Sequence, residues 1–262
     1  METMNDENFV IKNYRQMFFV GKRFFGNPLH CFRIYKLTKS FLFAKSWIDS
    51  SSKQDPPPDF HNEKHHIMME VMRIDDCVNE MNGERVDNSF AKENKYMNKW
   101  FGKGYKKHVE GSLFFIADTK DNGHFNFRGY YQNFERVLIN HSNKVDEYRN
   151  NYPKCRKCIL FINDESNPYV QVMDKADLKR KAPKGAYIPH QCFLDSKFID
   201  VIKKVKADYV IWVCRWKSIY VNGKQIKMPR IAIYDVKRLT YDGVNYKHEF
   251  MYKVTNEIYP TL

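Results

Sequence analysis

Two carboxylates in the first third of the chain have the residue types and spacing for metal-dependent chemistry. Asp59 follows three consecutive prolines, which hold its approach in an extended form. Glu70 lies inside the apolar run 66–74, which by its length is typical of a strand. A carboxylate on a turn and another on a strand can converge on Mg²⁺, which binds few protein carboxylates and keeps water for chemistry. Asp59 and Glu70 are therefore candidate metal ligands.

The position of Glu70 within this run calls for a partner. In a strand, Met68, Glu70 and Met72 share one face, because successive side chains alternate. A carboxylate on an apolar face is costly unless a cation, a hydrogen-bond donor or a metal ion meets it. The alternative to a metal site is that Glu70 pairs with a buried Arg or Lys and that Asp59 caps a turn.

The spacing of these residues resembles a known nuclease motif. Pro58-Asp59, followed by the ten residues 60–69 and then Glu70-Val71-Met72, is similar to the PD-(D/E)XK motif of the restriction-endonuclease-like fold. The expected order of a helix, hairpin strands, a second helix and a strand is also similar to that fold's core. The resemblance implies a Mg²⁺-dependent nuclease in which Asp59 and Glu70 hold the ion.

One departure from the motif bears directly on activity. Met72 stands where the family has a Lys that orients the attacking water and stabilises developing charge. Losing one such donor costs about 3–4 kcal/mol, or on the order of a few hundredfold in rate. Lys64 in the hairpin and Lys45 on the preceding strand are the candidates to supply the missing ammonium group. Arg73 points to the opposite face by alternation and is a poor substitute.

The charge of the chain favours a polyanionic partner. The sequence has 44 Lys and Arg against 31 Asp and Glu, a net charge of +13. Such an excess promotes nucleic-acid binding through counterion release. The chain is also rich in residues that AT-rich codons encode, so part of the excess can record genomic composition. Two basic loops, within 102–108 and 179–185, are candidate phosphate contacts, although a solvated loop is the alternative. Their candidate nucleic-acid-binding residues are Lys103, Lys106, Lys107, Lys179, Arg180 and Lys181.

The cysteines predict reduced thiols rather than a metal site. Cys155 and Cys158 have the spacing of half a zinc site, which His190 and Cys192 could complete. A second Cys-x-x-Cys is absent from the sequence, and the pair opens into an apolar run. We therefore expect these thiols in the core and do not expect zinc.

Apolar runs separated by amphipathic helices predict an α/β fold with a mixed central sheet flanked by helices. The runs expected to form strands are 32–35, 40–47, 66–74, 113–117, 158–163, 209–214 and 231–234. The helices are expected at 8–19, 131–148 and 194–205. Asn222-Gly223 is a hairpin turn signal. We expect one domain over 1–262, with a basic, polar excursion at about 77–111, and as the alternative a division near residue 110.

A second acidic group follows one of these strands. Asn163-Asp164-Glu165 ends the run 158–163, at the edge where open α/β sheets bind ligands. It could supply a third carboxylate to a site. The alternative is a polar turn that ends the strand and is closed by Asn167-Pro168.

These patterns together define the expected function. No apolar run approaches the ~20 residues of a membrane span, and residues 1–9 are polar and acidic, so we expect a soluble cytoplasmic protein without a membrane partner. The charge and the resemblance imply a metal-dependent nuclease-like protein that acts on or binds nucleic acid, with DNA as the expected partner. The alternative is a catalytically inactive module that binds nucleic acid or a partner within a defence or mobile-element system.

Overall fold

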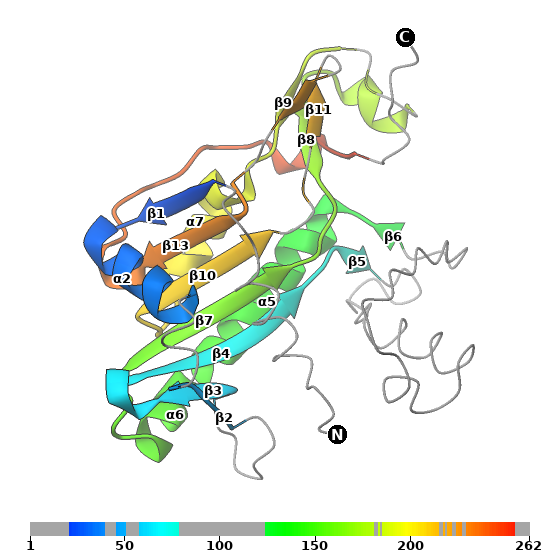
Figure 1. The fold of residues 1–262 in the computed structure, drawn as a ribbon. Helices are drawn as coiled ribbons and strands as arrows, with labels where there is room; N and C mark the ends of the chain where they lie inside the picture. The colour runs from blue at the N-terminus through cyan, green and yellow to red at the C-terminus, as the bar shows by residue number, and fades with distance from the viewer. Residues whose placement is uncertain are drawn as a thin grey trace, which may run out of the picture.

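The computed structural model describes most of the chain between residues 21 and 254. The described residues are 21–39, 46–50, 58–78, 124–180, 183, 185–214, 217, 219–221, 224–226 and 229–254. A mixed seven-stranded sheet forms their centre (Figure 1). Its strands, in spatial order, are β1 (Lys22–Phe25), β13 (Ile231–Asp235), β10 (Tyr209–Cys214), β7 (Lys157–Asp164), β4 (Ile67–Ile74), β3 (Phe60–Asn62) and β2 (Ile48–Asp49).

The three central strands are parallel, and the strands on either side reverse direction. β4 and β10 both run parallel to β7, whereas β13 is antiparallel to β10. β3 is antiparallel to β4 and to β2, so β2, β3 and β4 form a meander at one edge. All six residues of β10 are buried, as are all but the first of β7, which explains their continuous apolar sequences.

Helices cover both faces of the sheet, and this part of the fold prediction is confirmed. α5 (Phe127–Asn143), α6 (Val145–Asn151) and α7 (Ser196–Lys203) pack on one face, and α2 (Pro28–Lys39) packs on the other (Figure 1). The helix predicted at 131–148 exists but is divided into α5 and α6 at Lys144. The helix predicted at 194–205 corresponds to α7.

The predicted strand at 32–35 is wrong, because these residues belong to α2. The Asn27 side chain accepts hydrogen bonds from the backbone N–H groups of Leu29 and His30, and Pro28 occupies the first helical position. Both features start a helix and outweigh the strand preference of aromatic and branched residues. The buried residues of α2 also recur at helical spacing; they are Cys31, Ile34, Tyr35, Leu37 and Thr38.

Smaller sheets extend the structure beyond the carboxyl ends of β4 and β7 (Figure 1). One contains β14 (Met251–Lys253), β8 (Tyr169–Val172) and β9 (Tyr187–Pro189), with the short helix η4 (Lys175–Lys179) following β8. The others are β11 (Ile219–Val221) with β12 (Lys224–Ile226), and β5 (Cys77–Val78) with β6 (His124–Phe125). β11 and β12 are antiparallel on either side of Asn222-Gly223, as that turn signal predicts. The remaining short helices are η1 (Glu63–His65), η5 (Cys192–Leu194), η6 (Val236–Arg238) and η7 (His248–Phe250).

Several predicted elements lie outside the described residues. These are the helix at 8–19, the strand at 113–117 and the excursion at 77–111 apart from β5. The predicted strand at 40–47 also lies largely outside them; its last two residues, Ser46 and Trp47, are not in a strand, and β2 begins at Ile48.

Gly243 allows the segment after β13 to approach the start of α7 closely. Its φ is +88°, and a Cβ atom there would lie 2.6 Å from the Cα of Ser196. The next residue, Val244, accepts a hydrogen bond from the Ser196 N–H at 3.0 Å and donates one to the Leu194 carbonyl at 2.6 Å. This contact fixes the chain that leads to η7 and β14.

We predict that Gly243→Ala lowers the free energy of unfolding by more than about 1 kcal/mol, because the added methyl group meets backbone at a positive φ. Gly21→Ala is the control, since a Cβ at Gly21 would lie an ordinary 3.4 Å from the Pro229 Cα. Urea unfolding of both variants measures the difference, and equal stabilities would contradict the prediction.

Candidate functional site

The hairpin of β3 and β4 brings the segment that carries Asp59 beside the strand that carries Glu70. Phe60 pairs with Met69, and Asp59 immediately precedes β3. The turn between the strands is built by Asn62, whose side chain caps η1 by accepting from the His65 N–H. The Asp59 Oδ2 accepts a hydrogen bond from the Val71 N–H at 2.6 Å. Asp59 is thereby held against the strand that carries Glu70.

Glu70 is a buried carboxylate with one oxygen bonded and one oxygen without a donor. Its side chain is 7% exposed and faces α5 and α6. Oε1 accepts hydrogen bonds from the His141 Nδ1 at 2.7 Å and the Tyr148 hydroxyl at 2.9 Å. Oε2 is also buried, and no donor within the described residues reaches it. A buried carboxylate oxygen without a donor is destabilising unless a cation or water meets it.

The negative charges of Asp59 and Glu70 both affect the pKa of Tyr148, a residue of α6. Burial raises the pKa of Tyr148 far above its usual value, and the negative charges of Glu70 and Asp59 raise it further. The phenol therefore stays protonated and donates to Glu70. Of the two acids, Glu70 has the larger effect on this pKa.

The position of the motif Lys is filled by a core residue. Met72 is 4% exposed and packs in the cluster between the sheet, α5 and α7. The bonded donors of Glu70 are the imidazole of His141, which is 27% exposed, and the hydroxyl of Tyr148. Neither residue is predicted in this role from the sequence. Both fall at helical spacing within the helix predicted at 131–148, but nothing in that spacing indicates a carboxylate as their partner.

The candidate ammonium groups are not among the bonded donors of Glu70. Lys64 is exposed in η1, at the turn end of the hairpin. Lys45 lies outside the described residues. Arg73 points away from Glu70, as alternation predicts, and forms an ion pair with Glu165.

The described part of the predicted nucleic-acid contacts lies elsewhere in the molecule. Lys179 ends η4 and Arg180 follows it, beside β8 in the smaller sheet (Figure 1). Arg180 forms an ion pair with Asp177, so its charge is compensated locally. The structure does not bring these two residues to Glu70. The other four candidates, Lys103, Lys106, Lys107 and Lys181, lie outside the described residues.

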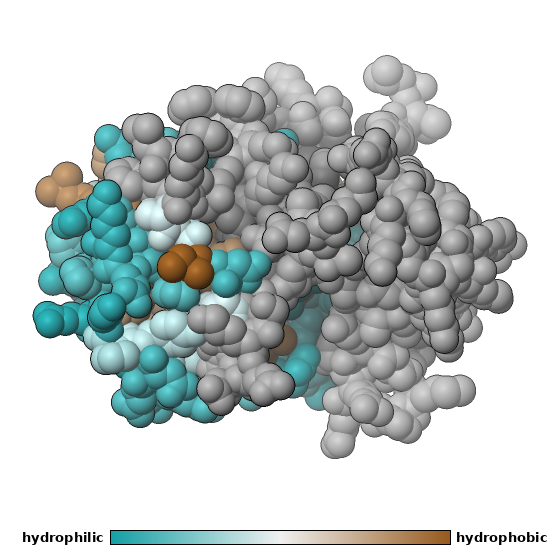
Figure 2. All heavy atoms as spheres, turned by 60° about the horizontal axis from the view of Figure 1, so that its bottom comes forward, coloured by the Kyte–Doolittle hydropathy of each residue, from teal (hydrophilic) through white to brown (hydrophobic). Residues whose placement is uncertain are grey.

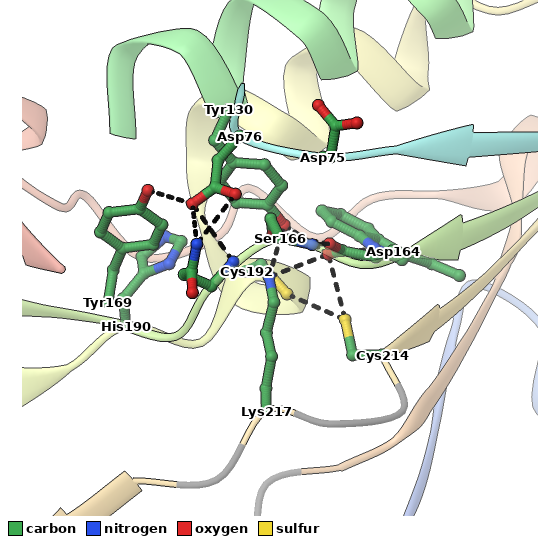
Figure 3. Close-up of polar contacts among 12 residues, drawn as sticks. Asp75, Asp76, Tyr130, Asp164, Ser166, Tyr169, His190, Cys192, Cys214 and Lys217 are labelled. Carbon is green, nitrogen blue, oxygen red and sulfur yellow. Dashed lines mark hydrogen bonds and ion pairs between the residues drawn. The ribbon is translucent and has the colours of Figure 1, made fainter. Parts of the chain in front are cut away.

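A second polar cluster occupies the carboxyl ends of the parallel strands, with Asp164 at its centre (Figure 3). Its Oδ1 accepts from the backbone and the hydroxyl of Ser166, at 2.9 and 2.6 Å. Its Oδ2 accepts from four groups: the Tyr130 hydroxyl (2.5 Å), the Lys217 Nζ (2.9 Å), the Trp212 Nε1 (3.0 Å) and the Cys214 Sγ (3.2 Å). The Lys217 ammonium also lies over the Tyr130 ring, 4.3 Å from its centroid.

Burial and pairing set the charge states of this cluster. Burial alone would raise the pKa of Asp164, but Lys217 and the surrounding donors hold it below its usual value. Burial alone would lower the pKa of Lys217, but the Asp164 carboxylate raises it above its usual range. The two side chains therefore form a buried ion pair in which both oxygens of the carboxylate are bonded.

The neighbouring aspartates after β4 have separate partners. Asp76 accepts hydrogen bonds from the Tyr169 hydroxyl and from Asn167, and burial raises its pKa. The Asp75 carboxylate points away from this cluster and accepts from the Asn133 side chain at 3.3 Å (Figure 3). The acids at this edge are thus distributed among separate hydrogen-bonded sites.

One group of three side chains here has the spacing of metal ligands. Ligand atoms of Asp164, Cys192 and Cys214 lie within 4.8 Å of one another, and the described chain contains no other such group of His, Cys, Asp or Glu. The Lys217 ammonium already neutralises Asp164 from 2.9 Å. The donor set therefore fits an ion pair better than a metal ion. Cys155 and Cys158, the proposed half of a zinc site, are buried in the core.

Comparison with protein-family models, with curated proteins and with solved structures found no match for this chain. Among the helices of the described residues, none has the length and apolar character needed to cross a membrane.

We predict that Lys217→Met destabilises the fold by about 3–5 kcal/mol, because it leaves a buried carboxylate without its cation. The double variant Asp164→Asn/Lys217→Met removes both charges and should lose less stability than the single variant. Urea unfolding measures both. A single variant that loses less stability than the double variant would contradict the assignment of a buried ion pair.

The lowered pKa of Asp164 also predicts the direction of its acid response. As the pH falls below about 4, the unfolded chain takes up the proton first, so the free energy of unfolding decreases until the pH passes the lowered pKa. The double variant lacks this component, and its stability should fall less steeply with acid. Unfolding curves collected across the acid range test this, and equal slopes would show that Asp164 does not contribute.

Proposed function

We propose that the protein is a divalent-metal-dependent nuclease-like protein that acts on nucleic-acid phosphodiesters, with Asp59 and Glu70 as its metal ligands. The observation that carries the proposal is the buried Glu70 Oε2, which no donor within the described residues reaches, on a strand whose Val71 N–H holds a second carboxylate. Oxygen ligands of this kind suit Mg²⁺ or Mn²⁺.

The order of elements around the two acids supports a restriction-endonuclease-like core. Along the chain, α2 is followed by the antiparallel strands β2, β3 and β4, and then by α5, α6 and the parallel strand β7. This is the order that the motif resemblance implies. Asp59 immediately precedes the middle strand of the meander, β3, and Glu70 lies within the third, β4.

The residues of the chain divide the work of such a site. His141 and Tyr148 hold Glu70 through Oε1, which leaves Oε2 to face a ligand. The Val71 N–H fixes one oxygen of Asp59. When bound, the ion would lower the pKa of a water molecule and neutralise charge on the phosphate. His141 is partly exposed, and its Nδ1 lies 2.7 Å from the Glu70 Oε1, so it is the group placed to move a proton there.

Met72 favours a second candidate function. An apolar side chain in the position of the motif Lys cannot stabilise developing negative charge, and it is fixed in the core. The chain would then be a catalytically inactive module that binds nucleic acid or a partner, within a defence or mobile-element system. The two functions differ in whether phosphodiester cleavage depends on Glu70.

We predict cleavage of plasmid DNA, single-stranded DNA or RNA in Mg²⁺ or Mn²⁺, and a loss of rate in Glu70→Gln. The loss of rate should exceed the loss of about 10- to 100-fold that follows when a residue hydrogen-bonded to a metal ligand is removed. The Gln amide oxygen keeps an acceptor for His141 and Tyr148, so the variant tests the charge rather than the packing. Glu147→Gln, an exposed neighbour of Tyr148 on α6, is the control and should retain full activity.

Two results would contradict the nuclease proposal. Cleavage that Glu70→Gln leaves unchanged would place the activity elsewhere. No cleavage of any substrate by the folded wild-type protein would eliminate the nuclease and leave the binding module as the function to be tested.

A further inference from the structure

Two short basic segments, different from the loops within 102–108 and 179–185, lie together at the amino ends of β4 and β7. One is the turn that carries Lys64, His65 and His66, and the other is the α6–β7 connection that carries Lys154, Arg156 and continues to Lys157. The Lys157 N–H donates to the His66 carbonyl at 3.1 Å, and the His66 Nδ1 lies 2.9 Å from the Lys154 carbonyl oxygen. We call these six residues the basic turn.

The positive charge of the basic turn is largely uncompensated. Lys64, Lys154, Arg156 and Lys157 are all exposed. Lys154 forms an ion pair with Glu63 at 2.9 Å. Within the described chain, no carboxylate lies at ion-pair distance from Lys64, Arg156 or Lys157. This end of the molecule, at the lower left of Figure 1, comes forward in Figure 2, where the coloured residues are mainly hydrophilic.

The positive electrostatic potential of the basic turn affects the pKa of His65, whose side chain is half-buried. Burial lowers the pKa of His65, and the positive charges of Lys64, Arg33 and His66 lower it further. Cations of α6 and at the end of α7, in contrast, have carboxylate partners. Arg149 and Lys206 both pair with Asp146, and Lys203 pairs with Asp242.

The basic turn is connected to the Asp59–Glu70 pair through α6. Tyr148 of α6 donates to Glu70, and the ring of Tyr152, just after α6, lies 4.8 Å from the ring of His61 in β3. The chain then runs directly from Tyr152 into Lys154. Along β4, Glu70 is three residues from Ile67 at the turn, or about 10 Å. A polymer that spans this distance can contact both places.

We propose that the basic turn binds the phosphate backbone of a nucleic acid and directs one of its phosphodiesters toward Asp59 and Glu70. This proposal rests on the proposed function for its substrate class, and it assigns the surface that holds that substrate. Recognition of this kind is electrostatic and independent of sequence, because the contacts are to phosphates. Lys64, Arg156 and Lys157 are the principal contacts.

The test compares two triple variants of equal net charge. Lys64→Ala/Arg156→Ala/Lys157→Ala removes the turn cations. Lys175→Ala/Lys197→Ala/Lys204→Ala removes three exposed cations, one from η4, one from α7 and one just after α7, and is the control. The affinity of each protein for a short DNA duplex, a single strand and an RNA is measured by fluorescence anisotropy over a series of salt concentrations, in Ca²⁺ or EDTA to prevent cleavage.

We expect the turn variant to bind at least about tenfold more weakly at low salt. The slope of log affinity against log salt should become shallower by about 2–3, since each phosphate contact contributes about 0.9 for duplex DNA and 0.7 for a single strand. The control should keep the wild-type slope. Binding of any of the three nucleic acids that shows this difference supports the proposal, and the form bound most tightly identifies the substrate.

The remaining outcomes separate this inference from the proposed function. If both triple variants bind nucleic acid equally weakly, or if neither binds more weakly than the wild type, the role of the basic turn is overturned, even where Glu70-dependent cleavage is present. Turn-dependent binding without any cleavage supports the basic turn and overturns the nuclease. Binding to vesicles of anionic lipid but to no nucleic acid overturns both.

Discussion

The buried carboxylate of Glu70 is the constraint on which the arrangement around the candidate site depends. It lies in the middle of a strand whose other inward-facing residues are apolar, so its charge must be met by groups from outside the strand. α5 and α6 supply those groups, His141 and Tyr148, from either side of the break at Lys144. The hairpin holds a second carboxylate, that of Asp59, against the same strand through the Val71 N–H. The donors bond one oxygen of Glu70, and no donor within the described residues reaches the other.

The two buried carboxylates Asp164 and Glu70 differ in how completely their oxygens are hydrogen-bonded. Asp164 is more deeply buried than Glu70, but both of its oxygens accept hydrogen bonds and Lys217 supplies the opposite charge. A fully bonded pair of this kind fixes the carboxyl ends of β7 and β10 and has no remaining acceptor to offer a ligand. Glu70 has no Lys or Arg among its bonded donors in the described chain, and no donor there reaches its Oε2. That difference, rather than the number of acids, identifies the Asp59–Glu70 pair as the candidate site.

The sequence predicts the parts of this structure that depend on local patterns. The apolar runs of β4, β7 and β10 and the amphipathic spacing of α5 and α7 are strong signals, and the need for a partner at Glu70 follows from alternation alone. α2 is mispredicted because its aromatic and branched residues suit a strand, whereas Asn27 and Pro28 start a helix. The pairing of Glu70 with His141 and Tyr148, and of Asp164 with Lys217, joins segments far apart in the chain, and no spacing rule within one segment encodes such a pairing. The two segments that form the basic turn are likewise far apart in the sequence and are brought together by the pairing of β4 with β7.

The most direct test of this account is the binding of Mn²⁺ to the folded protein, followed by electron paramagnetic resonance of the free ion. We expect one Mn²⁺ site per chain, from which Mg²⁺ displaces the ion and which is lost when Asp59 is changed to Asn, with the fold retained. Binding that survives this change, or no specific binding at all, would contradict the claim that Asp59 and Glu70 together hold a divalent cation.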